Sequence, residues 1–400
     1  MPSVLGCKSI YDVNVKGKTV FLRVDLNSPV VEGRVLMGAR IREHAKTIYY
    51  LSEEGAKTVV LSHQARPGEE GFISLKRHGE KLAKLLSREV KFCTWDSDYA
   101  SEIKKMQDGQ VLLLENVRFR EEEMEEKTAA EHAKGKLISE LAPLGDLFVQ
   151  DALSICHRQH ATVVGFSKRM PCYAGCYLLK ELEALSGLNA AKGKRLLVLG
   201  GAKPKDSIAV LEKMLETKRA DEAVLGGIFG ELFLWARGVR LGEKDKFFEG
   251  NGFSELKPKA KKILDKFGRK ISLPVDFAVS EKGKRREIPL SALPSTLSTF
   301  DIGKQTYGQF KAKIRASSLV IFNGPMGKYE EKQFGIGTQK VLEAVAFSRT
   351  FSIVGGGDTE KALSAIGLLP SDFDFVSLAG KALLEYLSGE KLPGLEVLKG

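Results

Sequence analysis

The chain has few residues of the kinds that mark secreted, disulfide-bonded or membrane proteins. Its five cysteines, Cys7, Cys93, Cys156, Cys172 and Cys176, are odd in number and include no CxxC pair. Such a set does not form a disulfide framework or favour a zinc site, so a reducing, cytoplasmic location is expected. Residues 1–12 contain no apolar core of a secretory signal. The longest apolar stretch, Ala223–Ala236, is short and contains Glu231, so it cannot span a bilayer.

The second part of the chain has no histidine, because all six histidines lie at or before His160. That part therefore offers no imidazole to act as a catalytic base. The composition is otherwise that of a soluble globular enzyme, with 43% hydrophobic and 28% charged residues, which excludes a disordered chain. A length of 400 residues exceeds one hydrophobic core and predicts two domains.

The net charge of +11 raises the question of nucleic-acid binding. The dense basic clusters, Lys257–Lys262 and Lys282–Arg286, are short and lack an aromatic platform. We therefore expect them on solvated faces and expect no nucleic-acid partner. Small anionic substrates are the better explanation of the charge.

One stretch, Phe351–Ala365, combines a strand, a glycine turn and a helix start. Phe351–Val354 is apolar and predicts a buried strand, Gly355–Gly357 leave the backbone open to a ligand, and a helix follows. Unpaired N–H groups at a helix N-terminus form an anion site. Asp358 beside an anion favours a divalent cation between the two. A plain turn with an Asp cap would explain this stretch alone equally well.

The same pattern recurs at three other strand ends, in the segments Arg195–Lys203, Asp221–Gly230 and Ser318–Gly327. In an open α/β sheet, ligands bind outside the carboxyl ends of the strands. Four such ends therefore predict one parallel sheet with a nucleotide cleft. Further along, Ile271–Val279 is expected as one strand interrupted at Pro274.

Polar side chains follow each predicted strand of the first part. The strands are expected at Thr19–Asp25, Lys57–Leu61, Val111–Leu114 and Leu147–Val149. Arg66, Arg118 and Arg158 each follow one of them, and Arg40 opens the first helix. Because guanidinium groups match phosphate and carboxylate, four on one sheet edge predict a site for a small polyanion. The acidic run Glu121–Glu126 is expected on a solvated face or loop.

These segments match, in order and over nearly the whole chain, the motifs of one family. The matching segments are Leu22–Pro29, Leu61–Gly68, Leu112–Phe119, Asp151–Thr162, Gly200–Ser207, Leu273–Val279, Phe322–Glu330, Gly355–Thr359 and Gly389–Leu398. Together they resemble phosphoglycerate kinase, and the archaeal branch more than the eukaryotic one.

The resemblance implies an α/β fold of two doubly wound, Rossmann-like parallel-sheet domains joined by a hinge helix. The N-terminal domain would span 1–170, the hinge 171–191 and the C-terminal domain 192–382, with a tail of about 383–400 packing back on the first domain. It also implies reversible phosphoryl transfer between ATP and 3-phosphoglycerate, giving ADP and 1,3-bisphosphoglycerate by domain closure, in glycolysis and gluconeogenesis. The cofactor would be Mg²⁺ with ATP or ADP, the enzyme a cytoplasmic monomer, and no membrane or nucleic acid would be involved.

Site residues follow from the resemblance by motif. The residues expected to bind phosphoglycerate are Asp25, Leu26, Asn27, Arg40, His63, Gln64, Ala65, Arg66, Arg118 and Arg158. The residues expected to bind the nucleotide are Gly201, Ala202, Lys203, Gly227, Asn323, Pro325, Glu330, Gly355, Gly356, Gly357, Asp358 and Thr359. Among them, Glu330 would contact the ribose. Asp358 would hold the metal. Arg40, Lys203 and Gly356 would act at the transferring phosphoryl group. Phosphoryl transfer requires positioning and charge neutralisation. It requires no catalytic base here, because a carboxylate acceptor is already deprotonated.

Two departures from the family pattern concern the phosphate site. Ser207 stands where a second lysine is usual, and Leu378–Ala382 reads LAGKA where a TGGGA turn is usual. We hypothesise that Lys381, or alternatively Lys205, supplies the missing positive charge as a catalytic residue. Three other functions remain open at this point. They are a weakened kinase, a dinucleotide oxidoreductase, although no GxGxxG opens a helix, and a non-catalytic anion-binding protein.

Overall fold

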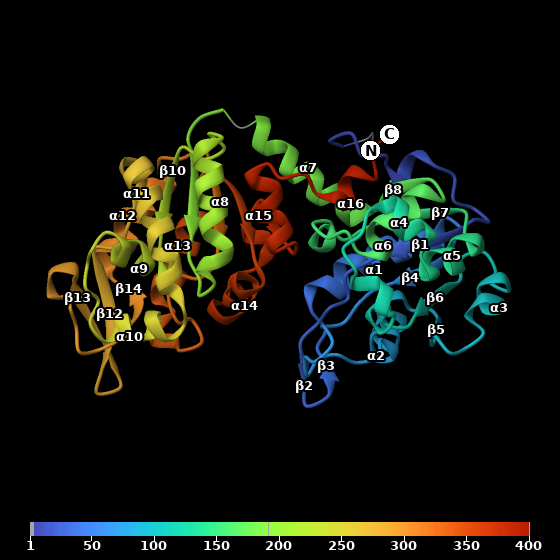
Figure 1. The fold of residues 1–400 in the computed structure, drawn as a ribbon, viewed down its shortest axis with the longest axis horizontal. Helices are drawn as coiled ribbons and strands as arrows, with labels where there is room; N and C mark the ends of the chain where they lie inside the picture. Colours follow the sequence, from blue (N-terminus) through green and yellow to red (C-terminus); the bar gives the residue numbers. More distant parts are fainter. Residues whose placement is uncertain (1–3, 191, 400) are drawn as a thin grey trace. The chain divides into compact units, whose positions relative to one another are not determined.

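Two six-stranded parallel sheets form the framework of the protein, one in each of two units (Figure 1). The computed structural model describes residues 4–190 and 192–399. Unit 1 comprises Met1–Gly187 and Lys391–Gly400, and unit 2 comprises Leu188–Glu390. Both sheets carry helices, as the sequence predicts for an α/β protein.

The sheet of unit 1 has the strand order β5-β6-β4-β1-β7-β8, with every pairing parallel. Its strands are β1 (Thr19–Arg23), β4 (Lys57–Leu61), β5 (Val90–Cys93), β6 (Val111–Leu114), β7 (Leu147–Gln150) and β8 (Cys172–Ala174). The central strand β1 is buried from Val20 to Arg23, which fits the continuous apolar runs of a sheet covered on both faces. The four strands predicted in this part are present; the edge strands β5 and β8 were not predicted.

Unit 1 contains seven α-helices in its first segment and one in its second, among the described residues. They are α1 (Ala39–Glu53), α2 (Lys76–Leu86), α3 (Tyr99–Lys104), α4 (Ala129–Lys134), α5 (Lys136–Leu141), α6 (Ala161–Val164), α7 (Cys176–Ala190) and α16 (Pro393–Glu396). A short hairpin, β2 (Val30–Val31) and β3 (Arg34–Val35), separates β1 from α1.

The sheet of unit 2 brings the four glycine-ended strands side by side. Its order is β11-β10-β9-β15-β16-β17, all parallel. The strands are β9 (Arg195–Leu199), β10 (Glu222–Leu225), β11 (Ile271–Ser272), β15 (Leu319–Asn323), β16 (Phe351–Gly355) and β17 (Phe375–Ser377). Since β10, β9, β15 and β16 are consecutive neighbours, the prediction of one sheet with its glycine turns on one edge is confirmed.

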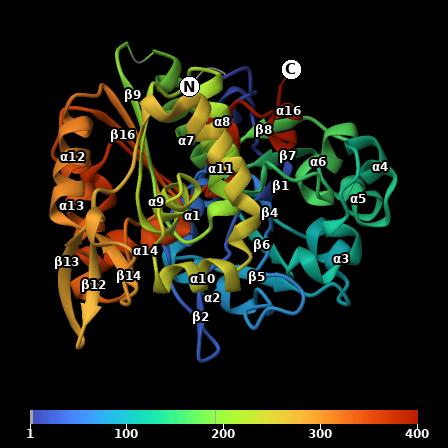
Figure 2. The same cartoon turned by 60° about the vertical axis from the view of Figure 1, so that its left-hand side comes forward.

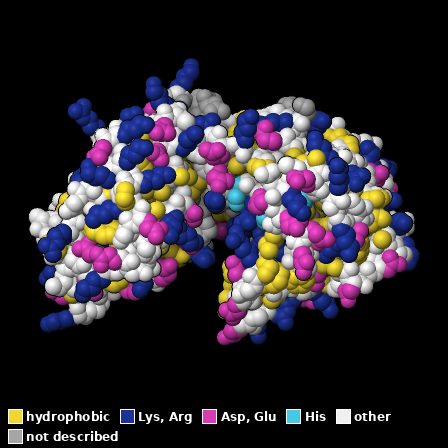
Figure 3. All heavy atoms as spheres, viewed as in Figure 1, with side chains coloured by type: hydrophobic (Ala, Val, Ile, Leu, Met, Phe, Trp, Pro, Cys, Tyr) yellow, Lys and Arg dark blue, Asp and Glu magenta, His cyan; other side chains and the backbone are white. Residues whose placement is uncertain are grey.

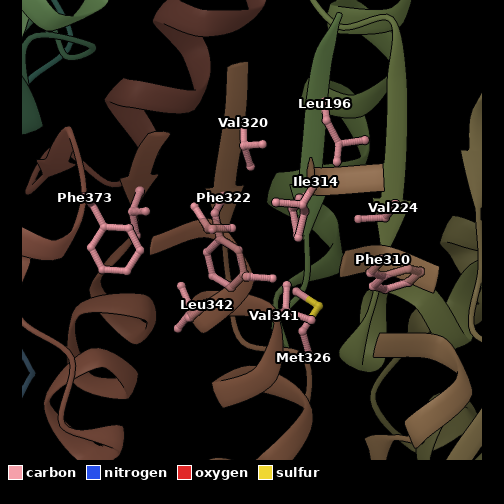
Figure 4. Packing of buried hydrophobic residues seen from close by; sticks show 14 of the residues in the cluster. Leu196, Val224, Phe310, Ile314, Val320, Phe322, Met326, Val341, Leu342 and Phe373 are labelled. Atoms are coloured by element: carbon pink, nitrogen blue, oxygen red, sulfur yellow. The ribbon is translucent and has the colours of Figure 1, made fainter. Parts of the chain in front are cut away.

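A core of aliphatic and aromatic side chains holds the helices of unit 2 against this sheet (Figure 4). Val320 and Phe322 of β15 pack with Val341 and Leu342, which lie on one of the helices. The helices are α8 (Pro204–Glu216), α9 (Gly227–Ala236), α10 (Glu243–Gly250), α11 (Lys257–Phe267), α12 (Lys304–Arg315), α13 (Ile336–Ala346), α14 (Gly357–Ile366) and α15 (Lys381–Ser388).

Unit 2 also contains an antiparallel sheet that was not predicted from the sequence. It has the order β13-β12-β14, formed by β12 (Asp276–Glu281), β13 (Lys284–Pro289) and β14 (Thr299–Ile302). The single strand expected at Ile271–Val279 was therefore wrong: β11 and β12 belong to different sheets. Pro274 lies between them, and because proline lacks an N–H it favours the change of direction.

The ends of the two units differ from the expected boundaries. Cys172–Ala174, expected in the hinge segment 171–191, forms edge strand β8 of unit 1, and α7 begins only at Cys176. Residue 191 lies outside the described residues. The tail also begins later than about 383, because α15 belongs to unit 2, where Arg219 donates to the carbonyl oxygens of Tyr386 and Leu387 at 3.2 Å.

The last ten residues return to unit 1 (Figures 1 and 2). In both views α16 lies beside β8 and α6. The N–H of Gly394 donates to the carbonyl oxygen of Cys156 at 2.8 Å, and the N–H of Lys8 donates to that of Leu398 at 3.0 Å. Leu392, Leu395 and Leu398 are buried. The tail is thus part of the core of unit 1.

Gly394→Ala is expected to destabilise unit 1 by about 1–3 kcal/mol, because a Cβ there would lie 2.8 Å from Cα of Cys156 and 2.9 Å from Cγ1 of Val163. The chain has one tryptophan in each unit, Trp95 and Trp235. Denaturant unfolding followed by Trp95 fluorescence in a Trp235→Phe background measures the effect. Gly308→Ala, within α12 and with open space at Cβ, is the control and should leave this transition unchanged. Equal transitions for both variants would contradict the assigned role of the tail.

Candidate functional site

A polar residue follows each of four neighbouring strands of unit 1 at its carboxyl end, and three of these residues, Asp25, His63 and Arg118, were predicted for the site. Asp25 follows β1, His63 follows β4, Arg118 follows β6 and Asp151 follows β7, in the sheet order β6-β4-β1-β7. Because parallel strands end at one edge, these side chains share one edge of the sheet.

Asp25 is a buried carboxylate that gathers hydrogen-bond donors. Nη1 of Arg40 lies 3.0 Å from its Oδ2, and the hydroxyl of Ser154 donates to the same oxygen at 2.6 Å. The N–H of Asn27 donates to Oδ1 at 3.0 Å. Burial alone would raise the pKa of Asp25, but Arg40, His63 and Ser154 together hold it well below its usual range. Asp25 therefore stays ionised and fixes the guanidinium of Arg40, at the start of α1.

The loop after β4 is tied to the loop after β1 by side-chain amides. Gln64 accepts from the N–H of Ser28 and donates to its carbonyl oxygen, both at 2.9 Å. Oδ1 of Asn27 accepts from the N–H of Ala65 at 3.0 Å. Leu26 donates its N–H to the hydroxyl of Ser62 at 2.9 Å. The predicted residues of these two loops thus lie together as one hydrogen-bonded unit.

Arg23 is a buried cation in this group that was not predicted from the sequence. Its Nε donates to Oγ1 of Thr162 at 2.8 Å, and its Nη2 lies 3.6 Å from Oε1 of Glu123. Nη2 also lies 3.4 Å from Nδ1 of His63. Burial lowers the pKa of Arg23 and Glu123 opposes that effect. The signal in the sequence was an arginine inside an otherwise apolar strand.

Glu123 corrects the expectation that the acidic run Glu121–Glu126 is wholly solvated. Its side chain is fully buried and accepts from the N–H and the hydroxyl of Thr162, each at 2.8 Å. The run forms a 3-10 turn over Glu121–Met124, which points this residue inward while Glu125 and Glu126 remain exposed. A buried arginine needs such a counter-ion, because an unpaired buried charge is costly.

His63 is held neutral at this edge. Burial lowers its pKa well below 6.5; Asp25 opposes that shift, whereas Arg118, Arg23 and Arg40 add to it. A neutral imidazole accepts through one nitrogen and donates through the other. His63 therefore orients neighbours by hydrogen bonds and does not contribute a positive charge near pH 7.

The arginines predicted to bind an anion act on one another. Arg118 is buried, its Nη1 donates to the carbonyl oxygen of Ala65, and its Nε has no hydrogen-bond partner among the described residues. Burial and the charges of Arg23 and Arg158, with a smaller effect of Arg66, lower the pKa of Arg118 to about 10, although Glu123 opposes them. Like charges this close create a field that an oxyanion would relieve.

The glycine edge of unit 2 is tied together by backbone hydrogen bonds. Gly200 donates to the carbonyl oxygen of Asn323 at 2.9 Å and Gly201 to that of Pro325 at 2.7 Å. A Cβ at Gly200 would lie 2.2 Å from the carbonyl oxygen of Pro325, so the turns after β9 and β15 approach too closely for a side chain. Gly356 has φ of +100°, the region that favours glycine.

A small cavity of about 210 Å³ lies at this edge, bordered by the N-termini of three helices. It is lined by Gly200, Gly201, Ala202, Lys203, Asp206, Ser207, Asn323, Gly324, Gly356, Gly357, Asp358, Thr359, Gly380, Lys381 and Leu384. The helices are α8, α14 and α15. Helix N-termini present unpaired N–H groups and partial positive charge, so the cavity is built for an anion. Gly355 is not among the lining residues, and its carbonyl oxygen accepts from Nδ2 of the lining residue Asn323 at 2.9 Å.

Lys381 and Lys205 differ in their relation to the small cavity. Lys381 lines it, and its Nζ lies 3.1 Å from Oε1 of Glu385 one turn along α15. Lys205 is exposed and is not among the lining residues, whereas Ser207 is buried in the wall.

Asp358 is the one predicted metal ligand. Its Oδ2 lies 3.3 Å from Nζ of Lys203 and its Oδ1 lies 3.8 Å from Nζ of Lys361. Within 4–190 and 192–399, no group of three His, Cys, Asp or Glu side chains is arranged to hold a metal ion. Mg²⁺ keeps several waters and binds through one or two carboxylates together with phosphate oxygens. A single half-exposed carboxylate at the mouth of an anion cavity fits that donor set.

A large cavity of about 450 Å³ adjoins the small one, and the two share Gly201, Ala202 and Asp358. Its apolar walls include Ile228, Phe247, Phe277, Phe300 and Met326. Gly227, Pro325 and Glu330, predicted for nucleotide binding, also line it. Its aromatic walls were missed, because Phe247 and Phe300 come from distant segments with no motif of their own.

On the face shown in Figure 3, Lys and Arg side chains are interspersed with Asp and Glu rather than gathered into one block. In the described part of the chain, no helix combines the length and apolarity needed to cross a membrane.

Comparisons with known proteins agree across sequence and structure. A family model described as phosphoglycerate kinase matches residues 10–390. Curated phosphoglycerate kinases of Methanosarcina mazei and Archaeoglobus fulgidus are each 39% identical over 98% of this chain, covering 94% and 97% of those proteins. The crystal structure of phosphoglycerate kinase from Pyrococcus horikoshii has a TM-score of 0.92 at 36% identity. The structure of phosphoglycerate kinase from Coxiella burnetii has a TM-score of 0.81 at 32% identity, and each match covers 98% of both chains.

Asp25→Asn is expected to change how the stability of unit 1 depends on pH. The folded pKa of Asp25 lies below its ordinary value of 3.8. Ionised Asp25 therefore stabilises unit 1 fully above about pH 4, and this contribution is lost as the pH falls through the folded value. The variant should be less stable by roughly 3 kcal/mol at pH 7, because a buried pair is broken, and its unfolding free energy should fall less steeply below pH 4.

Trp95 fluorescence during urea unfolding at several pH values measures this difference. The unit 2 transition, followed by Trp235 in a Trp95→Phe background, is the control and should not respond. Parallel pH curves for the wild-type protein and the Asp25→Asn variant would show that the carboxylate is not held as described.

Proposed function

The chain belongs to the phosphoglycerate kinase family, and from that premise we propose which residues bind each reactant. The protein transfers a phosphoryl group reversibly between ATP and 3-phosphoglycerate, giving ADP and 1,3-bisphosphoglycerate in glycolysis and gluconeogenesis. The observation that carries the assignment of the nucleotide is the junction of an apolar cavity with a glycine-lined anion cavity at Gly201, Ala202 and Asp358. A base and a triphosphate need these two environments side by side.

We assign 3-phosphoglycerate to the polar edge of unit 1. Arg66, Arg118 and Arg158 neutralise its phosphate and carboxylate, since guanidinium groups bind both with paired N–H donors. Asn27 and His63 orient the ligand by hydrogen bonds. Leu26, Gln64 and Ala65 contribute the backbone of the two loops that the amide contacts hold together.

Arg40 has a separate role in this assignment. Its guanidinium is held at 3.0 Å by the buried carboxylate of Asp25, so its position is set before substrate binds. An arginine fixed in this way stabilises charge on the transferring phosphoryl group without reorganising during the reaction. We therefore propose Arg40 as the catalytic residue of unit 1.

The nucleotide occupies the two cavities of unit 2. The base lies in the large cavity and the ribose near Glu330, while the phosphates lie in the small cavity against Gly356, Gly357 and Thr359. The side chain of Lys203 is exposed, and its ion pair with Asp358 lies in contact with solvent. Such a pair is weak, so the ammonium of Lys203 can leave Asp358 and bind a phosphate oxygen. Gly356 brings backbone close to the phosphoryl group that moves.

Asp358 would hold the magnesium ion that accompanies ATP or ADP. The bound ion supplies charge neutralisation for the phosphate oxygens. The residues of this chain do the remaining work: Lys203 and the three helix N-termini bind and orient the phosphate chain.

No general base is needed, because the acceptor is a carboxylate that is ionised at neutral pH. Transfer requires both reactants in one water-poor space, so we propose that substrate binding draws the two units together about the helix α7. On the same premise we propose that the enzyme acts as a cytoplasmic monomer on small-molecule substrates, without nucleic acid or membrane.

Arg40→Ala is expected to lower kcat about 10³-fold or more in a coupled assay with 3-phosphoglycerate and magnesium ATP, since the charge on the transferring group loses its fixed partner. The KM for ATP should change little, because the nucleotide binds in unit 2. Arg34→Ala, at an exposed arginine of the β2–β3 hairpin, is the matched control and should retain wild-type kcat. Absence of turnover in the wild-type protein would refute the assigned reaction.

Lys381→Ala is expected to lower kcat about tenfold, because Lys381 supplies the charge that Ser207 cannot. Lys205→Ala is the matched control and should stay within about twofold, or about 0.4 kcal/mol. If both variants stay within twofold, neither lysine compensates. A tenfold loss in Lys205→Ala alone would reverse the assignment.

A further inference from the structure

A buried ion pair lies in the wall of the large cavity of unit 2, beside the aromatic rings of Phe247 and Phe300. Nζ of Lys244 lies 3.4 Å from Oε2 of Glu231, and the side chains are 10% and 6% exposed. Nζ also donates to the carbonyl oxygen of Thr299 at 2.8 Å, and the hydroxyl of Thr299 donates to Oε1 of Glu231. The rings of Phe247 and Phe300 lie 5.2 and 5.9 Å from Nζ.

Packing alone does not account for this pair. Burying two charges carries a desolvation penalty, and well-packed apolar residues in their place are often as stable or more so. Burial raises the pKa of Glu231 against the effect of Lys244, in keeping with that penalty. Both residues line the cavity, so they are available to a ligand.

The pair has hydrogen-bonding capacity left over. An ammonium has three N–H donors, and two from Lys244 go to Glu231 and Thr299 among the described residues. Each carboxylate oxygen of Glu231 accepts one bond and keeps a further lone pair. The cavity wall therefore offers a donor beside an acceptor, in an order fixed by three elements: α9, α10 and β14.

We propose that Lys244 and Glu231 read the edge of the nucleobase and select a 6-aminopurine over a 6-oxopurine. Lys244 donates to the ring nitrogen N1, and Glu231 accepts from the neighbouring exocyclic amino group. In a 6-oxopurine the order is reversed, because the oxygen at C6 accepts and N1–H donates. In the same position, a 6-oxopurine would place its oxygen against the carboxylate of Glu231, so that two acceptors face each other. Its N1–H would face the ammonium of Lys244, so that two donors face each other.

This inference rests on the proposed function, in which the large cavity holds the base. It adds a basis for nucleotide preference that the glycine motifs do not contain, since glycine offers no side chain to recognise a base. The sequence showed Glu231 as the single acid in the apolar stretch Ala223–Ala236. Its partner Lys244 lies in a different helix, α10.

The test compares kcat/KM for ATP and ITP, with 3-phosphoglycerate and saturating magnesium. The wild-type enzyme is expected to prefer ATP at least about tenfold, as a site built to hydrogen-bond one edge rejects the mismatched one. The variant Glu231→Gln with Lys244→Met keeps side-chain size and removes both charges. Its preference is expected to fall to within about threefold.

The control makes the same two substitutions at a surface pair of the same unit. Glu212→Gln with Lys259→Met removes the pair between α8 and α11, where Nζ and Oε2 lie 3.3 Å apart, and should keep the wild-type preference. Binding of ADP and IDP by calorimetry, without 3-phosphoglycerate, gives a second readout that does not need turnover.

Two results would overturn the inference. One is a wild-type preference below about threefold. The other is a preference that survives in the double variant because ATP and ITP lose kcat/KM equally, as a purely structural pair would give. If the double variant does not fold, the ratio of kcat/KM for ATP to that for ITP in the wild-type enzyme still tests the inference, because a value below about threefold overturns it. A protein that prefers ADP to IDP through this pair but does not phosphorylate 3-phosphoglycerate would refute the proposed function and leave the inference standing.

Discussion

The buried carboxylate of Asp25 is the contact on which the polar edge of unit 1 depends. Arg23, Arg40, Arg118 and Arg158 bring positive charge to one region, and burial together with the charges of Arg23 and Arg158 lowers the pKa of Arg118. Two buried acids offset that charge from within: Asp25 fixes Arg40, and Glu123 pairs with Arg23. The arginines can therefore present positive potential to an anionic ligand, while the two acids offset the repulsion that would otherwise destabilise the folded unit.

Unit 2 meets the same need for positive potential with backbone rather than side chains. The small cavity draws on the N-termini of α8, α14 and α15, with Lys203 and Lys381 exposed at its border. Backbone dipoles cost no side-chain entropy to order, and their N–H groups remain uncharged.

Much of the fold could be predicted from the sequence, because apolar runs ending in glycines or polar residues are local signals. The four glycine-ended strands are neighbours in one sheet, as expected. The short edge strands β5, β8 and β17, and the sheet around β12, lacked such signals. Glu123 could not be told from the other acids of its run, since only the three-dimensional position of Arg23 selects it. The walls of the large cavity come from segments far apart in sequence, and no local pattern marks them.

The last residues of the chain have a consequence for biosynthesis. The ribosome synthesises Leu188–Glu390 before Lys391–Gly400. Unit 2 is therefore fully synthesised while unit 1 still lacks the buried residues Leu392, Leu395 and Leu398. The surface of unit 1 at α6 and Cys156 therefore cannot be covered by the tail until Leu392, Leu395 and Leu398 have been synthesised. The domain that begins first is thus the one completed last.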